Sequence, residues 1–232
     1  MHKSNLTIEG IPALLWGATT DRLIIAVHGT MGSKEDFELL AEEACNNGFQ
    51  VLSFDLPEHG ERKNEDYACN PQNGIKDLTK ILNYARGLSS RISLYACSLG
   101  AYFSLLAFQN ETFEQCLFLS PVVDMQRLIV NMMQAAGVSE KRLQVEKVIA
   151  NPYGPQFDWE YYSYVKAHPI EKWEKPTAIL MGSEDEVSEV DAVKAFASRF
   201  DAGLQLLEGS KHYLHTEEEI IEIRKWMRKN LL

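Results

Sequence analysis

Short apolar runs alternate along this chain with longer segments whose apolar residues recur at helical spacing. Residues 23–27, Leu-Ile-Ile-Ala-Val, form a continuous apolar run typical of a strand that is buried on both faces. Residues 35–47 follow with a helical pattern, which Gly48 ends as a glycine just beyond a helix does. A strand, a crossover helix and a second strand build a parallel sheet with helices on both faces, so the sequence predicts an α/β protein.

The alternation continues to the end of the sequence. A short hairpin is expected first, from residues 6–9 and 13–16. Further strands are expected at residues 51–54, 92–96, 116–119, 177–181 and 204–207. Further helices are expected at residues 71–87, 99–110, 190–200 and 217–231. With 232 residues, of which 45% are hydrophobic, the chain can bury one substantial core, and we expect a single domain over residues 1–232.

Charge and cysteine content argue against several classes of protein. The 23 basic and 33 acidic residues give a formal net charge of −10, which repels nucleic acids and anionic membrane surfaces. No nucleic acid partner is expected, and no membrane span either, because no run of about 18 apolar residues occurs. The four cysteines form no C-x-x-C pair, so free thiols in a reducing compartment are expected. With no apolar leader at residues 1–6, we expect a cytoplasmic protein.

Residues 122–175 interrupt the alternation, because two helical patterns and an aromatic stretch stand where one crossover helix is usual. We expect this segment to be a cap or lid insertion. Its aromatic residues either pack the insertion onto the body or form part of a lid over a substrate pocket, and the sequence leaves both readings open. These residues are Tyr153, Phe157, Trp159, Tyr161, Tyr162, Tyr164 and Trp173.

Ser98 lies between a predicted strand and a predicted helix, in the pentapeptide Ala-Cys-Ser-Leu-Gly at residues 96–100. This is the pattern of a nucleophile elbow, a strained turn that holds a serine hydroxyl above the sheet and needs small residues two positions before and after the serine. Ala96 and Gly100 meet that need, although glycine is more usual at the first position. Cys97 points the other way by strand alternation, so we expect a packed thiol there and not a nucleophile.

A serine hydroxyl is a poor nucleophile at neutral pH, so it needs an imidazole to take its proton and a carboxylate to orient the imidazole. His212 and His215 follow the last predicted strand, at the sheet edge toward which an elbow points its hydroxyl. The carboxylate is expected between the serine and the histidine in the chain, and Asp185 and Asp124 are the candidates. The other histidines are His2, His28, His59 and His168.

Two further motifs accompany the elbow. Residues 28–32, His-Gly-Thr-Met-Gly, follow the first long apolar strand, and residues 55–60, Asp-Leu-Pro-Glu-His-Gly, follow the next one. Together with Ser98 they resemble the HGxxG oxyanion loop, the D-x-P-G-H-G pattern and the elbow of the α/β-hydrolase superfamily, with Glu58 in place of a glycine. Within it the chain resembles the small, capped carboxylesterases, acylglycerol lipase-like enzymes and serine aminopeptidase-like hydrolases. The resemblance covers nearly the whole chain and implies the α/β-hydrolase fold with a helical cap.

The resemblance also implies the site residues. His212 matches the family's G-x-x-H followed by an aromatic residue, and Asp185 matches its G-x-x-D, so Ser98, His212 and Asp185 are expected to form a catalytic triad. His215 is expected beside the start of the last helix, and Asp124 is expected to begin the first helix of the insertion.

An oxyanion forms when the serine attacks a carbonyl, and two backbone N–H groups are the expected donors to it. Leu99 supplies one from the start of a helix, where the helix dipole also favours negative charge. Thr30 supplies the other from the loop after His28 and Gly29. His28 and His59 are expected to stabilise their loops by hydrogen bonds.

The function expected from the sequence is a serine hydrolase that acts on a small-molecule carboxylic ester. No cofactor and no metal are required for that chemistry. An amidase, an aminopeptidase or a thioesterase could use the same residues, and a catalytically silent binding protein is an alternative of another class. Acyl and alcohol specificity and the oligomeric state are not readable from the sequence.

Overall fold

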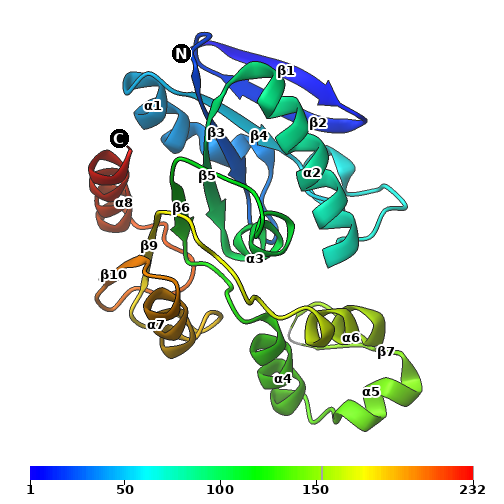
Figure 1. Cartoon of the computed structure of the whole chain (residues 1–232). Helices are drawn as coiled ribbons and strands as arrows, with labels where there is room; N and C mark the ends of the chain where they lie inside the picture. The colour runs from blue at the N-terminus through cyan, green and yellow to red at the C-terminus, as the bar shows by residue number, and fades with distance from the viewer. Residues whose placement is uncertain (153, 232) are drawn as a thin grey trace.

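The computed structural model describes residues 1–152 and 154–231, and within them eight strands form one sheet (Figure 1). The strands are β1 Lys3–Ile8, β2 Ile11–Trp16, β3 Arg22–Val27, β4 Gln50–Phe54, β5 Arg91–Cys97, β6 Cys116–Leu119, β9 Thr177–Gly182 and β10 Gly203–Leu207. Their order across the sheet is β1-β2-β4-β3-β5-β6-β9-β10. β2 pairs antiparallel with β1 and β4, and every other neighbouring pair is parallel. The predicted mostly parallel sheet is confirmed.

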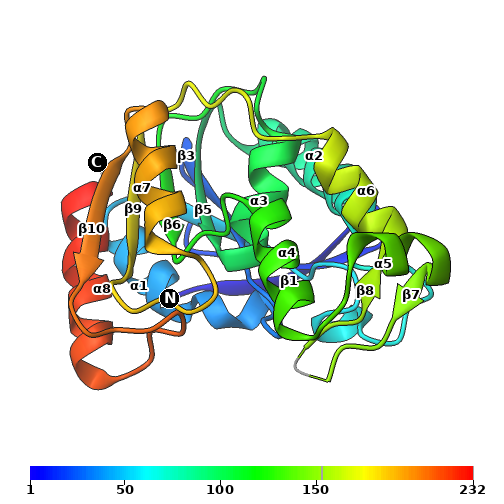
Figure 2. The ribbon, with the colours of Figure 1, turned by 90° about the horizontal axis from the view of Figure 1, so that it is seen from below.

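Helices cover both faces of this sheet (Figure 2). They are α1 Glu38–Asn46, α2 Pro71–Leu88, α3 Ser98–Ala107, α7 Val190–Arg199 and α8 Glu217–Asn230. α2, α3 and α7 supply apolar side chains to the core on one face, and α1 and α8 supply them to the core on the other. The sheet therefore separates two apolar clusters, and its central strands have no face in contact with solvent.

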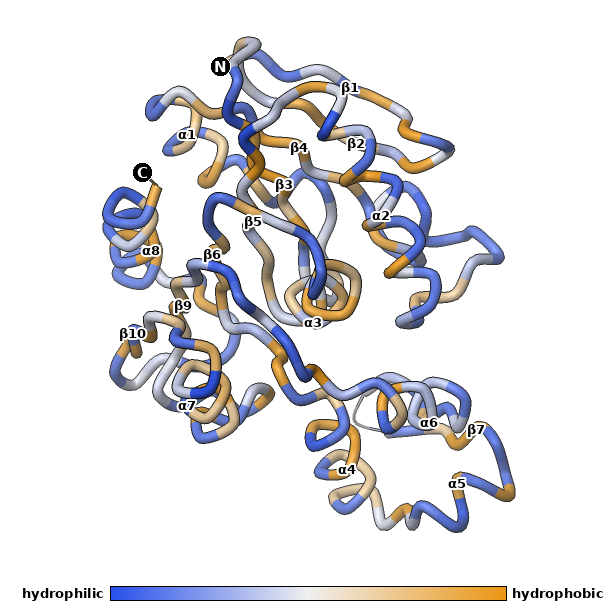
Figure 3. The backbone as a smooth tube through the Cα atoms, viewed as in Figure 1, coloured by the Kyte–Doolittle hydropathy of each residue, from blue (hydrophilic) through white to orange (hydrophobic). Residues whose placement is uncertain are grey.

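Strand β3 shows why its sequence is apolar throughout. Leu23, Ile25 and Val27 belong to the cluster beneath α2 and α3, whereas Ile24 and Ala26 belong to the cluster beneath α1 and α8. Successive side chains of a strand point to opposite faces, so a strand buried on both sides needs an apolar residue at every position. Figure 3 shows hydrophobic residues along the middle strands and hydrophilic ones along the turns and the outer helices.

The segment between β6 and β9 projects beyond the edge where these parallel strands end (Figure 1). It holds α4 Met125–Ala135, α5 Glu140–Glu146 and α6 Trp159–Ala167, with a small hairpin of β7 Val148–Ile149 and β8 Phe157–Asp158. Met133, Leu143 and Phe157 contribute to a separate apolar cluster inside the segment. The aromatic stretch, for which no element was predicted, contains β8 and α6.

The aromatic residues of this segment divide between two packing sites. Phe157 and Tyr162 are buried in the segment's own cluster, with Trp159 packed against it. Tyr161, Tyr164 and Trp173 pack into or against the main core beneath α3. Tyr153 lies outside the described residues.

Helix ends follow local chemistry and differ from the predicted bounds by a few residues. The helix expected at residues 35–47 begins as a short 3₁₀ helix, Lys34–Phe37, before α1. The backbone N–H of Lys34 donates to buried Asp55 at 2.8 Å, and its Nζ lies 2.9 Å from the same carboxylate. Thr216 caps α8 through a capping box with Glu219, as expected beside His215.

Candidate active site

The turn from β5 into α3 holds Ser98 in a strained backbone conformation. Ser98 has a φ of 46°, in the left-handed region that L side chains rarely adopt, while Cys97 before it is extended. The turn is tight because the chain after β3 crosses it. A Cβ added at Gly100 would lie 2.3 Å from the carbonyl oxygen of His28, and one added at Gly29 would lie 3.0 Å from the Cβ of Ser98. The glycine two residues after the serine is therefore a steric requirement of this turn.

Ser98, His212 and Asp185 are joined in one hydrogen-bonded chain. Oγ of Ser98 lies 2.9 Å from Nε2 of His212, and Nδ1 of His212 lies 2.8 Å from Oδ2 and 2.9 Å from Oδ1 of Asp185. An ionised carboxylate only accepts hydrogen bonds, so Nδ1 carries a proton and Nε2 is left to accept the hydroxyl of Ser98. The structure thus brings together all three residues expected to form the triad.

Asp185 lies in a loop that leaves its carboxylate buried but well supplied with donors. Its side chain is 0% exposed, whereas that of His212 is 17% exposed. Oδ1 of Asp185 accepts the backbone N–H of Val187 at 2.9 Å and that of Ser188 at 2.7 Å. These two donors and the imidazole compensate the burial of a negative charge. The sequence did not indicate the two backbone donors, because they depend on the folding of this loop.

The loop after β9, which holds Asp185, and the loop after β10, which holds His212, are in direct contact and are joined by hydrogen bonds. The backbone N–H of Glu184 donates to the carbonyl of Ser210 at 2.9 Å, and a Cβ added at Gly182 would lie 2.1 Å from that same carbonyl oxygen. The carboxylate of Glu186 accepts the backbone N–H of His212 at 3.2 Å. β9 and β10 are parallel neighbours and end at the same edge of the sheet. These contacts bring the loop with His212 against the loop with Asp185, which we call the aspartate loop.

His28 and His59 lie near the serine but are occupied by their own loops. Nδ1 of His28 donates to the carbonyl of Gly29 at 2.8 Å, and its Nε2 accepts the N–H of Leu56 at 3.0 Å. Burial lowers the pKa of His28 to about 4, so its imidazole is neutral at physiological pH. Nδ1 of His59 lies 2.8 Å from the carbonyl oxygen of Pro57. Both histidines hold turns, as expected.

The remaining candidates lie outside the hydrogen-bonded chain. Asp124 caps α4, where its side chain accepts the N–H of Arg127 at 2.9 Å. His215 stacks on Tyr213 with ring centroids 4.8 Å apart, just before α8. His168 stacks on Tyr164 in the segment between β6 and β9. His2 bonds to Ser4 near the N-terminus.

Two backbone N–H groups next to the serine have no acceptor among the described residues: those of Leu99, in the first turn of α3, and Thr30, in the loop after β3. Cys97, beside the nucleophile position, packs against the core beneath α1 and α8 on the other face of the sheet. Burial raises the pKa of its thiol to about 12, which keeps it protonated and unreactive.

Neither a metal cluster nor a membrane-spanning helix is found within residues 1–152 and 154–231. No group of three or more His, Cys, Asp or Glu side chains in this part of the chain could hold a metal ion. No helix there is long and apolar enough to cross a bilayer.

Comparisons with known proteins find similar sequences and similar structures. The model of the alpha/beta hydrolase family matches residues 24–223. The monoglyceride lipase homolog of monkeypox virus is 24% identical over an alignment of 264 residues, covering 98% of this chain and 94% of the viral one. Est1E from Butyrivibrio proteoclasticus, solved with ferulic acid bound, superposes with a TM-score of 0.78 at 18% identity, covering 97% and 96% of the two chains. The monoacylglycerol lipase of Paleococcus ferrophilus superposes with a TM-score of 0.69 at 17% identity, covering 94% and 98%.

Proposed function

This chain belongs to the α/β-hydrolase family, and from that premise we propose that it is a serine hydrolase that cleaves carboxylic esters. The observation that carries the proposal is the hydrogen-bonded chain from the hydroxyl of Ser98 through the imidazole of His212 to the carboxylate of Asp185. This arrangement has the hydrogen-bond connections and the tautomer that proton transfer from a serine requires.

In the proposed reaction Oγ of Ser98 attacks the ester carbonyl while Nε2 of His212 takes the hydroxyl proton. The negative charge of Asp185 stabilises the imidazolium that results. When the tetrahedral intermediate collapses, the C–O bond to the alcohol breaks and His212 returns the proton to the departing alkoxide, which leaves an acyl-serine. Water then attacks this ester with His212 as base, and the carboxylic acid and free Ser98 are released.

We propose that the backbone N–H groups of Leu99 and Thr30 receive the oxyanion of each tetrahedral intermediate. Leu99 follows the nucleophile in the first turn of α3, so its N–H is reinforced by the helix dipole. Because neither N–H has an acceptor within the described residues, both are available for an incoming oxyanion. A lost donor of this kind typically raises the barrier by roughly 3 kcal/mol.

The choice of an ester rests on relatives whose names refer to a monoglyceride lipase homolog and a monoacylglycerol lipase. The same triad serves amidases, aminopeptidases and thioesterases, and these are the competing activities.

We further propose that residues 122–175 form a cap over the serine within a single domain, because α4 starts directly beyond the carboxyl end of β6, next to the elbow. The protonated, packed thiols fit the proposed cytoplasmic location.

A matched panel of substrates tests the ester assignment. A carboxylic ester, a thioester and an amino-acyl amide with the same acyl group should be turned over with the ester strongly preferred. Efficient amide turnover with poor ester turnover would contradict the assignment while leaving the triad in place. No turnover of any of them, with no reaction of Ser98 toward a fluorophosphonate, would favour a silent binding protein.

A further inference from the structure

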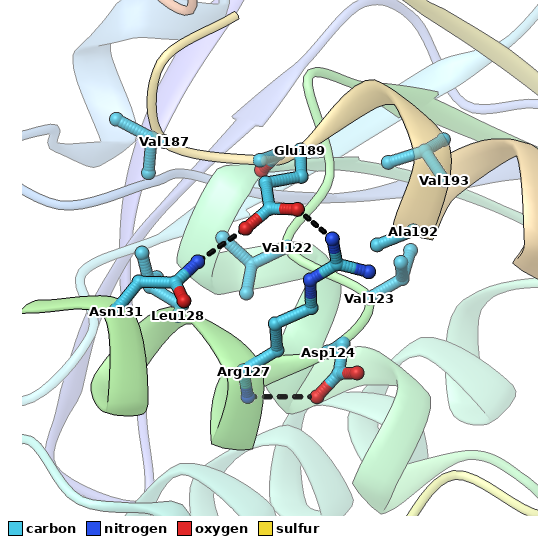
Figure 4. Close-up of a pocket in the computed structure, with 11 residues that line it drawn as sticks. Val122, Val123, Asp124, Arg127, Leu128, Asn131, Val187, Glu189, Ala192 and Val193 are labelled. Carbon is cyan, nitrogen blue, oxygen red and sulfur yellow. Dashed lines mark hydrogen bonds and ion pairs between the residues drawn. The ribbon is translucent and has the colours of Figure 1, made fainter.

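A small cavity lies beside the proposed active site, between the loop after β6, α4, the loop after β9 and the start of α7; we call it the side pocket (Figure 4). Its apolar lining comes from Val122 and Val123 after β6, Leu128 on α4, and Val187 and Val193 in and after the aspartate loop. The rest of the lining is polar, from Asp124, Arg127, Asn131, Ser188 and Glu189, so it is the apolar part that suits an aliphatic group.

The side pocket adjoins the triad through the backbone. The N–H of Val122 donates to the carbonyl oxygen of Ser98 at 3.2 Å, and the N–H of Val187 donates to the carboxylate of Asp185 at 2.9 Å. β5, β6 and β9 are consecutive neighbours in the sheet, and neighbouring strands lie about 4.8 Å apart. An acyl group carried on Ser98 needs to extend by only one to two strand spacings to reach this lining.

A polar bridge crosses the side pocket. Arg127 and Asn131 lie four residues apart on one side of α4, and both bind the carboxylate of Glu189, the residue just before α7 (Figure 4). The Arg127 and Glu189 side chains are 46% and 38% exposed, so the pair is screened by solvent and adds little to stability. The bridge therefore joins the segment 122–175 to the aspartate loop with contacts that can open.

With the bridge closed, the side pocket is too small for a long chain. The volume within the side pocket that the centre of a water molecule can occupy is about 20 Å³. A water molecule needs roughly 10–15 Å³ by this measure, so a chain of several carbon atoms does not fit.

We propose that Arg127, Asn131 and Glu189 form a latch that sets the longest acyl chain this hydrolase accepts, and that the side pocket receives the distal carbons of the acyl group when the latch opens. This inference rests on the proposed esterase function. The latch residues act on specificity through the size of the pocket and take no part in the proton transfers at Ser98.

The test compares kcat/KM over p-nitrophenyl esters of two to eight acyl carbons. Arg127→Ala and Glu189→Ala should each raise the ratio of kcat/KM for the eight-carbon ester over the two-carbon ester by about tenfold, the effect of burying roughly two further methylenes at about 0.8 kcal/mol each. The gain should appear mainly in KM for the longer esters. The exchange Arg127→Glu with Glu189→Arg rebuilds the pair and should return the ratio toward that of the natural protein.

A matched control is the pair Arg142 and Glu146 on α5, whose side chains are 51% and 45% exposed and which does not line the side pocket. Arg142→Ala should leave the chain-length ratio unchanged. Fluorophosphonate labelling of each variant verifies that the serine remains reactive and the protein folded.

The outcomes separate the two proposals. Labelling and ester turnover with an unchanged ratio in both alanine variants would overturn the latch alone. The same shift in Arg142→Ala, or a shift confined to esters that vary in the alcohol, would also overturn it. Absence of labelling and of all ester turnover in the natural protein would overturn the esterase function and the latch with it.

Discussion

The hydrogen bonds to Asp185 determine which tautomer of His212 it stabilises. Two backbone N–H groups, from Val187 and Ser188, donate to its Oδ1, and Nδ1 of His212 lies 2.8 Å from Oδ2 and 2.9 Å from Oδ1. An asparagine at this position would turn its carbonyl oxygen toward the two backbone donors and its NH₂ group toward Nδ1 of His212. The imidazole would then carry its proton on Nε2, where it cannot accept one from Ser98.

Asp185→Asn should therefore lower kcat by about 10⁴-fold while changing the free energy of unfolding little. Steady-state kinetics and denaturant unfolding measure the two quantities. Asp191→Asn is the matched control, since the Asp191 side chain is 84% exposed on α7, and it should leave kcat unchanged. Equal activity of the natural protein and Asp185→Asn would show that this carboxylate does not orient the base.

His28 gives a prediction about stability and pH. Its pKa is lowered from 6.5 to about 4 by burial, so between these values the unfolded chain binds a proton that the folded chain refuses. The free energy of unfolding should thus fall as the pH drops from about 6.5 to 4, by on the order of 3 kcal/mol from this group. Denaturant unfolding across that range should show a shallower loss in His28→Gln. Parallel pH curves for the two proteins would mean that His28 titrates normally.

At the scale of elements, the elbow depends on how closely the chain after β3 approaches the start of α3. A Cβ at Gly100 would lie 2.3 Å from the carbonyl oxygen of His28 and 2.7 Å from that of Val27. Gly87, in the last turns of α2, has nothing within 4 Å of the corresponding position. A methyl group at position 100 would therefore clash with backbone, whereas one at position 87 would meet no other atom.

Gly100→Ala should lower the free energy of unfolding by about 2 kcal/mol or more and reduce ester turnover, because backbone must move to admit the methyl group. Gly87→Ala should leave turnover unchanged and stabilise the protein by up to about 1 kcal/mol through its higher helix propensity. Thermal or denaturant unfolding with parallel kinetics measures both. Unchanged stability and turnover in Gly100→Ala would mean that the backbone at this crossing has room for a methyl group.

Elements whose apolar pattern matches a single geometry could be predicted from the sequence, whereas a helix with apolar residues on several sides could not. β3, β6 and α8 lie within a residue or two of the expected bounds, because their apolar pattern matches one geometry. α6 was missed because Tyr161 and Tyr164 pack toward the main core while Tyr162 packs toward the segment's own cluster. Apolar residues on several sides of a helix remove the spacing that identifies it.

At the scale of the whole molecule, the hydrogen-bonded chain of Ser98, His212 and Asp185 combines loops that follow three different strands. The pattern of the turn indicated Ser98, while His215 and Asp124 stayed open as alternatives until the resemblance to family motifs singled out His212 and Asp185. It could not indicate that Arg127 contacts Glu189, because these residues lie 62 positions apart in segments without a motif. Contacts between the segment 122–175 and the rest of the chain depend on how the two are placed, and local patterns carry little information about that.

The four thiols are free and report on the packing of the whole chain. Burial raises the pKa of Cys69 and of Cys97 to about 12, and it raises the pKa of Cys45 and Cys116 as well. At pH 8 the folded protein should react with a disulfide reagent roughly 100-fold more slowly than the protein in guanidinium chloride. Absorbance of the released thiol follows the reaction, and fast reaction of the folded protein would contradict the packing.

The reaction of the protein with a fluorophosphonate, followed by intact mass and by mapping of the modified peptide, tests the central claim most directly. A nucleophile activated by His212 predicts one adduct per chain on Ser98, with the reaction lost in Ser98→Ala and strongly slowed in His212→Ala, while His215→Ala reacts like the natural protein. An adduct on another residue, or equal labelling of Ser98 without the imidazole at position 212, would contradict the account.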